Sequence, residues 1–198
     1  MISQNQFNFI KSKYQYWSSW AIWADQGDTP KSNVGDLSVL DPNTNPKLLP
    51  TLNPNIALVA LNISRGDITL PFGNFHDARS EATDYKIRYA TNDTPLWGAY
   101  MTDIIKDFEE KISGKVKSYL RENRDFEKEN VDFFVQELSD IGATNPTLIA
   151  FGNESYDILK RNLNNEFKIH KIPHYANYSS KEKYRMQIKE VMEVSLKA

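Results

Sequence analysis

Four short runs of β-branched, aromatic and aliphatic residues stand out along the chain, and their length and composition predict β-strands. These runs are residues 56–61 (IALVAL), 99–105 (AYMTDII), 147–151 (TLIAF) and 167–172 (FKIHKI). Apolar residues at helical spacing lie between and after them: Val131, Phe134, Val135, Leu138 and Ile141; Tyr156, Leu159 and Leu163; and Tyr184, Ile188, Val191 and Met192. Strands that alternate with helices in this way predict an α/β fold, a three-layer α/β/α sandwich around a central, mostly parallel four-stranded sheet.

Two long segments interrupt this alternation. Residues 24–55 are rich in Pro, Asn, Asp and Gly and predict an irregular connection over the surface. Residues 62–98 predict a long polar connection between the first two strands, with a helix near 76–90. Farther along, Ser179 and Glu182 have the spacing of a capping box, which predicts the start of the C-terminal helix.

The N-terminal segment contains the densest group of aromatic residues in the chain. Tyr16, Trp20 and Trp23 follow helical spacing, so we expect a helix whose aromatic face packs this segment onto the sheet rather than stacking on bases. We expect one domain over residues 1–198. Within it, residues 1–55 form the N-terminal helix and irregular segment, and residues 56–198 form the α/β core.

Composition excludes several kinds of chemistry. The chain has no cysteine among its 198 residues, which excludes disulfides, thiolate nucleophiles and cysteine-ligated metals. Its 24 Lys and Arg against 26 Asp and Glu give a formal charge of −2, so a nucleic-acid site must be a local patch. The first 17 residues lack the layout of a signal peptide, and no apolar stretch reaches the roughly 18 residues of a membrane span. We expect a cytoplasmic monomer without membrane contact.

Polar residues stand at the ends of the predicted strands. Asn62 follows the first strand, Asp103 lies inside the second, Asn153 follows the third and His174 follows the fourth. Ligands of open parallel sheets bind beyond the carboxyl ends of the strands, so these four side chains are expected to converge on one cleft.

These four segments, over roughly residues 55–198, resemble the uracil-DNA glycosylase superfamily in order and content. ALNI is similar to the family's first motif and sets Asn62 on its catalytic position, and the family's base-stacking Phe, thirteen residues later, falls at Phe75. YMTDIIK resembles the base-reading strand, with Asp103 in place of an Asn. IAFGNES and HYANYS are similar to the last two motifs, with Asn153 in the former and His174 opening the latter.

The resemblance implies hydrolysis of the N-glycosidic bond of an extruded or single-stranded base, as in base excision repair, without metal or cofactor. It implies that His174 stabilises the departing base, Asn62 positions water and Phe75 stacks on the base. Asp103 and Asn153 would contact the base. The expected partner is single- or double-stranded DNA, or a nucleobase or nucleotide.

The expected nucleic-acid contacts lie in two loops. Ser64 and Arg65 follow the first strand and are placed to meet phosphate, although a surface Arg is commonly only solvated. Tyr178 takes the place of the family's wedge residue, and Ser179 matches the last residue of the histidine motif. Ala176 replaces a serine that grips phosphate in the family.

The replacement of Asn by Asp at position 103 leaves two alternatives. An ionised carboxylate only accepts hydrogen bonds, whereas the amide of Asn accepts and donates at once. Either burial keeps Asp103 protonated, so that it imitates the amide, or the pocket prefers a base that donates there, such as cytosine or adenine.

Other interpretations of the same residues remain open. Asn62 can cap a turn, Phe75 can be a core residue, and Asp103 can pair with Arg65 or Lys106. The main rival function is a binding module of the same fold that recognises a nucleobase, a nucleotide, modified DNA or a protein. An unrelated phosphate-handling enzyme would need a Gly-rich loop, and the sequence contains none.

Overall fold

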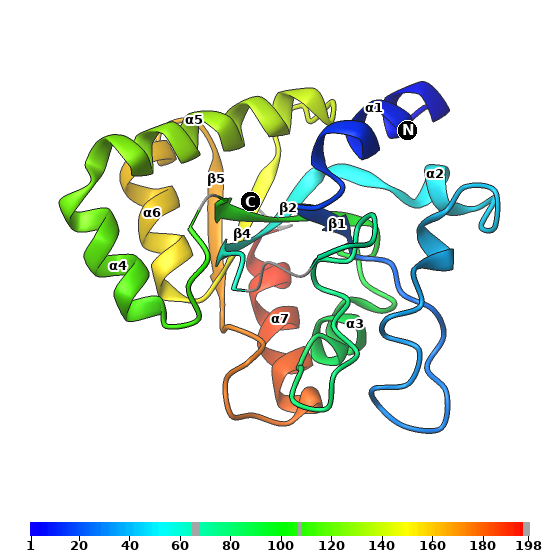
Figure 1. The fold of residues 1–198 in the computed structure, drawn as a ribbon. Coiled ribbons are helices and arrows are strands. Elements are labelled where there is room, and N and C mark those ends of the chain that lie inside the picture. Colours follow the sequence, from blue (N-terminus) through cyan, green and yellow to red (C-terminus); the bar gives the residue numbers. More distant parts are fainter. Residues whose placement is uncertain (65–67, 107, 196–198) are drawn as a thin grey trace.

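The computed structural model describes residues 1–64, 68–106 and 108–195, and its centre is a five-stranded sheet (Figure 1). The strands are β1 (Ser18–Trp20), β2 (Asn53–Asn62), β3 (Ala99–Ile105), β4 (Thr147–Phe151) and β5 (Lys168–Ile172). Their order across the sheet is β1-β3-β2-β4-β5, with β1 antiparallel to β3 and the other neighbours parallel. The four predicted strands are confirmed as β2 to β5.

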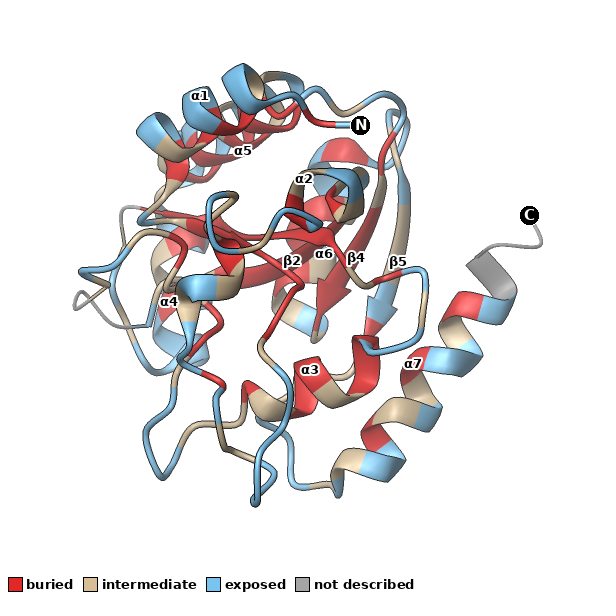
Figure 2. Cartoon of the chain, turned by 90° about the vertical axis from the view of Figure 1, so that its right-hand side faces the viewer, coloured by how far each residue is buried: buried red, intermediate tan, exposed pale blue. Residues whose placement is uncertain are grey.

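Helices cover both faces of this sheet (Figures 1 and 2). They are α1 (Gln4–Tyr14), α2 (Leu48–Thr51), α3 (Tyr85–Thr91), α4 (Ser113–Glu122), α5 (Arg124–Asp140), α6 (Asn153–Leu163) and α7 (Lys181–Ser195), with a 3₁₀ helix, η1, at Leu37–Leu40. One core contains side chains of α1, α4, α5 and α6, and the other contains those of α3 and α7. Strand β2 contributes to both, since Ala57 and Val59 face the first core while Leu58 and Ala60 face the second.

The prediction of a four-stranded sheet is wrong, because a fifth strand lies at the edge. Strand β1 has three residues and pairs with β3, with Ser18 opposite Thr102 and Trp20 opposite Tyr100. Two of its three residues are serines, which give no strand signal in the sequence. Pairing with β3 satisfies its backbone groups, so a tertiary contact makes this strand.

The aromatic segment is not the predicted helix. Helix α1 ends at Tyr14, and the chain turns before it enters β1. Trp20 and Trp23 are nonetheless buried, as expected for residues that pack the segment onto the sheet, while Tyr16 is 47% exposed. The packing prediction is therefore confirmed for the two tryptophans and wrong for Tyr16.

The helix starts differ from the predicted ones in two places. Helix α3 begins at Tyr85 rather than near residue 76, because the preceding segment is fixed by a turn in which the Asp84 carboxylate accepts the N–H of Asp77 at 2.8 Å. At α7, Oγ of Ser180 accepts the N–H of Lys183 at 3.2 Å, so Ser180 rather than Ser179 caps the helix.

The irregular course predicted for residues 24–55 is confirmed for 24–52, with η1 and α2 as short helices, whereas residues 53–55 already belong to β2. The buried guanidinium of Arg88, in α3, holds its first part. It donates to the carbonyl oxygens of Ala24 at 3.2 Å, Pro30 at 2.7 Å and Ser32 at 2.7 Å. One charged side chain thus satisfies backbone acceptors that have no secondary structure to pair with.

Over the described ranges, none of the helices is both long and apolar enough to cross a membrane.

Candidate functional site

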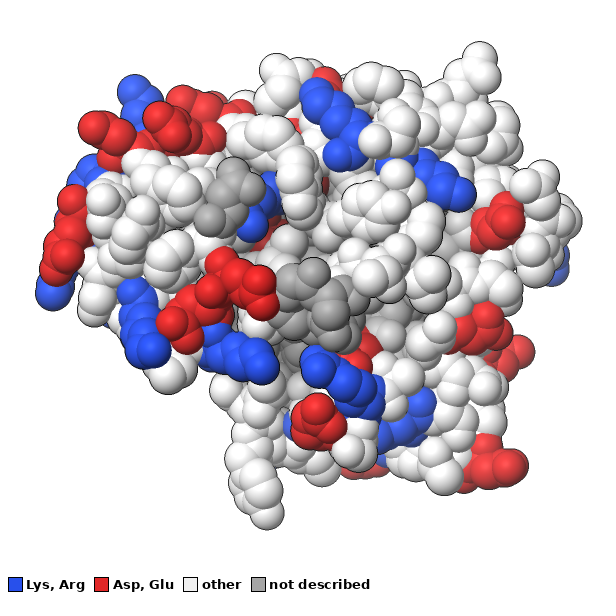
Figure 3. All heavy atoms as spheres, viewed as in Figure 1, with Lys and Arg blue, Asp and Glu red and all other residues white. Residues whose placement is uncertain are grey.

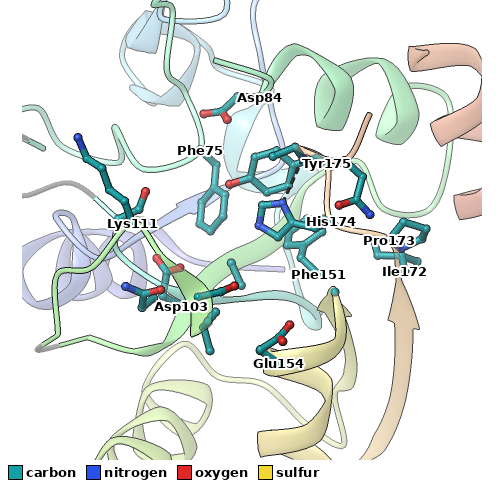
Figure 4. Close-up of a pocket in the computed structure, with 18 of the residues that line it drawn as sticks. Phe75, Asp84, Asp103, Lys111, Phe151, Glu154, Ile172, Pro173, His174 and Tyr175 are labelled. Carbon is teal, nitrogen blue, oxygen red and sulfur yellow. Dashed lines mark hydrogen bonds between the residues drawn. The ribbon is translucent and has the colours of Figure 1, made fainter. Parts of the chain in front are cut away.

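A cavity of about 740 Å³ opens at the carboxyl ends of β2, β4 and β5 (Figure 4). Its wall includes Asn62 at the end of β2, Asp103 in β3, Phe151 at the end of β4, and the segment after β5. Parallel strands bring these ends together at one edge of the sheet; Ala60 lies opposite Asp103 in the register. The predicted residues Asn62, Ser64, Phe75, Asp103, Asn153 and His174 all line this cavity.

Aromatic rings form the apolar part of the cavity wall. Phe75 lies 6.3 Å from Phe151 and 6.4 Å from Tyr175 between ring centroids, and Phe151 meets Tyr175 edge-on at 5.2 Å. Phe75 has a φ of 65°, in the left-handed region that is uncommon for a non-glycine residue. A planar ligand entering the cavity would therefore contact aromatic side chains from three separate segments.

His174 lies beside this wall, and a hydrogen bond to its ring defines its tautomer. Its ring stacks on Tyr175 with centroids 4.4 Å apart, and its Nδ1 lies 3.1 Å from the backbone nitrogen of Ala176. Because a backbone N–H can only donate, Nδ1 accepts and the neutral ring carries its proton on Nε2. Burial lowers the pKa of His174, while the charge of Glu154 opposes this effect. The site therefore contains a neutral imidazole with one N–H donor.

Asp103 supplies the most buried carboxyl group of the cavity wall. Its side chain is 2% exposed, and Oδ2 accepts a hydrogen bond from Nδ2 of Asn74 at 2.7 Å. Burial raises its pKa to about 7, although Asn74 and Lys106 favour the ionised form. Asp103 therefore changes charge near neutral pH, which bears on the two alternatives that the sequence left open.

Of the two alternative ion pairs of Asp103, the one with Lys106 does not form between the two side chains. Lys106 donates to the backbone oxygen of Asp103, and its Nζ pairs with the carboxylate of Glu137 at 2.8 Å. Arg65 lies outside the described residues. Within the described ranges, the carboxyl group of Asp103 accepts from an amide, that of Asn74, which the sequence did not indicate.

Asn62 lines the cavity but has a structural task as well. Its Nδ2 donates to the carbonyl oxygens of Phe108 and Glu110, each at 2.9 Å, and lies 3.2 Å from that of Ile63. These bonds hold the segment after β3 against the end of β2. The amide hydrogens are thus engaged, and Oδ1 is the atom that can orient a water.

The remaining predicted residues lie at the rim or beyond it. Asn153 begins α6, is exposed, and accepts from Nζ of Lys171 at 3.0 Å. Ser64 is exposed at the rim. Tyr178 is fully exposed on the loop before α7, and neither Tyr178 nor Ser179 is part of the cavity wall.

Charges of both signs surround the opening. The lining carboxyl groups are Asp77, Asp84, Asp103, Glu110 and Glu154, and the lining cations are Arg79, Lys111 and Lys171. Figure 3 shows acidic and basic side chains intermixed on the face seen there, without a broad basic surface. This balance differs from the basic groove typical of proteins that grip a phosphate backbone.

Sequence reasoning missed two residues of the site. Asn74 precedes the expected stacking residue, and only the fold shows that its amide reaches Asp103. Tyr175 follows His174 and is identified by its ring contacts rather than by a motif.

In the part of the chain that the structure describes, no group of three His, Asp or Glu side chains is placed to hold a metal ion. Comparisons of the chain with protein-family models, with curated proteins and with solved structures found no match.

Proposed function

We propose that this protein hydrolyses the N-glycosidic bond between a nucleobase and its sugar. The base would enter the cavity as part of DNA or of a free nucleoside. The observation that supports this most is the meeting of Phe75, Asp103 and His174, which are far apart in the sequence, at one cavity. Its volume, about 740 Å³, lies in the range of small-molecule sites. A three-layer fold of the uracil-DNA glycosylase type is part of the same proposal.

The chemistry requires stabilisation of the departing base. Breaking the bond leaves negative charge on the base, and a fixed hydrogen-bond donor lowers the barrier. His174 provides such a donor, since Nδ1 is occupied by the Ala176 N–H and the proton sits on Nε2. Loss of one such donor in other enzymes costs about 3 kcal/mol in the transition state.

Aromatic contacts and a water complete the proposed site. Phe75, Phe151 and Tyr175 line the cavity, although Phe75 and Phe151 are also core residues, 3% and 2% exposed, and stacking on an open aromatic face is worth about 1–3 kcal/mol per base. Oδ1 of Asn62 can orient the attacking water by accepting a hydrogen bond from it. A neutral amide cannot take the proton of that water, so the reaction depends on stabilising the departing base.

Two observations favour a second candidate, a binding module that retains the pocket without turnover. The amide hydrogens of Asn62 bind the backbone of the segment after β3, and among the described residues of the cavity wall carboxyl groups outnumber cations. Such a protein would hold a base or nucleoside in the same cavity.

Release of free base distinguishes these functions. We would incubate the protein with single- and double-stranded DNA containing uracil or other altered bases, and with nucleosides, and quantify the released base. His174→Ala should reduce release by about 100-fold or more. His170→Ala is the matched control, since His170 lies in β5 and outside the cavity wall. Binding without release by the wild-type protein would favour the binding module.

A further inference from the structure

The Asp103 carboxyl group is fixed at one oxygen and open at the other. Oδ2 accepts from Asn74, whereas Oδ1 forms no hydrogen bond with any residue that the structure describes. The side chain is almost fully buried, yet it forms part of the cavity wall. A carboxyl oxygen at a cavity wall that accepts from none of the described residues is an acceptor available to a ligand, so this atom points to a ligand that donates a hydrogen bond.

Asn74 fixes the orientation of this carboxyl group. Its Nδ2 donates both to Asp103 at 2.7 Å and to the backbone oxygen of Trp17 at 3.1 Å, and its Oδ1 accepts the N–H of Phe75 at 3.1 Å. All polar atoms of the amide are thus engaged, so it cannot rotate to follow different ligands. Asn74 is a positioning residue, and Asp103 presents a fixed acceptor.

The aromatic wall decides which part of a base meets this acceptor. Phe75, whose backbone N–H is bound by Asn74, lies in the cavity wall between Asp103 and Tyr175, and Phe151 packs against both Phe75 and Tyr175 (Figure 4). A base stacked on these rings presents its edge, rather than its face, to the carboxyl group. Hydrogen-bond complementarity along that edge then sets specificity.

An ionised carboxylate discriminates sharply among base edges because it only accepts. Guanine offers two adjacent donors, the ring N1–H and the 2-amino group. They match the two oxygens of a carboxylate, since Oδ2 can accept a second hydrogen bond beside that of Asn74. In cytosine and adenine the amino group lies beside a ring nitrogen acceptor, and in uracil the N3–H lies between two carbonyl oxygens. Each of those edges sets an acceptor against the carboxylate.

We propose that Asp103, held by Asn74, makes the cavity selective for bases with a guanine-type edge, in which a ring N–H adjoins an exocyclic amino group. The selectivity concerns binding, and its consequence for a reaction rests on the proposed glycosidic hydrolysis. His174 completes the recognition, since its Nε2–H can donate to an acceptor of the same base.

The selectivity should depend on pH. Burial is the main cause that raises the pKa of Asp103 to about 7; Glu137, from α5, and Asp84, at the start of α3, raise it further, while Asn74 and Lys106 lower it. A ligand with two donors binds the ionised form, so its affinity should rise between pH 6 and pH 8. The protonated form has one donor and one acceptor and accommodates uracil-type edges better.

Equilibrium binding of nucleosides to the full chain tests this inference without requiring turnover. We would measure guanosine, inosine and uridine by titration calorimetry at pH 6 and pH 8. Inosine keeps the N1–H but lacks the 2-amino group. Guanosine should bind about tenfold more tightly than inosine at pH 8, the change expected for one hydrogen bond to a charged group, and the ratio should fall at pH 6.

Substitutions separate the carboxylate from its surroundings. Asp103→Asn should abolish the preference for guanosine and improve the relative binding of uridine. Asn74→Ala should weaken the preference by freeing the carboxyl group, while Asp157→Asn, which removes an exposed carboxylate of α6 outside the cavity wall, should keep it. The wild-type pH series serves as a test even where a variant fails to fold.

The possible outcomes are distinct. Equal binding of guanosine and inosine at pH 8, an unchanged preference in Asp103→Asn, or no nucleoside binding at millimolar concentration would overturn the inference. A guanosine preference in a protein that releases no base from any substrate would support the inference and contradict only the hydrolysis.

Discussion

Nζ of Lys106 lies 2.8 Å from Oε2 of Glu137, and the two side chains are 2% and 0% exposed. The hydroxyls of Tyr100 and Thr102 donate to the other carboxylate oxygen at 2.7 and 2.9 Å. This ion pair joins the segment after β3 to helix α5, and Nζ of Lys106 also donates to the backbone oxygen of Asp103. Glu137→Gln should lower the free energy of unfolding by about 3–5 kcal/mol, because it leaves the Lys106 charge buried without a counter-ion.

Urea unfolding at pH 7 measures this loss, and two other variants serve as controls. Lys13→Ala breaks the more exposed pair with Asp140 and should cost less than about 1 kcal/mol. The double variant Lys106→Met with Glu137→Met removes both buried charges and should be more stable than Glu137→Gln. Equal costs for the buried and the surface pair would contradict the prediction.

His76 should make the protein less stable as the pH falls. It is buried against Trp23, and burial lowers its pKa from 6.5 to about 4. Between those two values the unfolded chain binds the proton and the folded protein does not, so stability decreases on acidification. His76→Phe should remove about 2–3 kcal/mol of the loss between pH 6.5 and pH 4.5, as measured by urea unfolding at each pH. A pH dependence identical to that of the wild type would count against the buried neutral state.

Asp103 should have the opposite effect in an overlapping range of pH. Its pKa in the folded protein, about 7, lies above the ordinary value of 3.8, so the folded protein binds the proton first and acidification from pH 7 to pH 4 stabilises it. Asp103→Asn lacks this gain. Its free energy of unfolding relative to wild type should therefore be highest at pH 8 and fall by about 3–4 kcal/mol by pH 4. A difference that stays constant over this range would show that Asp103 is ionised throughout.

Substitution by alanine should have opposite effects on stability at two glycines, Gly98 and Gly114. Gly98 has a φ of 85°, and an added Cβ would overlap the backbone oxygen of Thr51, so Gly98→Ala should destabilise the protein by several kcal/mol, about 3 or more. Gly114 lies in α4 with open space around it, so Gly114→Ala should stabilise the helix by about 0.5–1 kcal/mol. Thermal unfolding of the two variants beside wild type checks both signs, and a destabilising Gly114→Ala would contradict the account of α4.

The local sequence pattern determined the main strands and the longer helices. Residues 99–105 and 147–151 form strands with the predicted bounds, because short runs rich in apolar residues are buried most favourably between two covered faces of a sheet. Helix α5 likewise buries Val131, Phe134 and Leu138, which follow helical spacing. Because parallel strands align their carboxyl ends, the order of these elements also indicated where Asn62 and His174 would meet.

Only the tertiary structure decided the edge strand and the chemistry of Asp103. Ser18 and Ser19 have no intrinsic preference for a strand, and they form one because β3 presents unpaired backbone groups beside them. The pKa of Asp103 depends on its burial and on the amide of Asn74, 29 residues away. Periodicity is a local property that a sequence displays directly, whereas dielectric surroundings and hydrogen-bond partners exist only once distant segments have packed together.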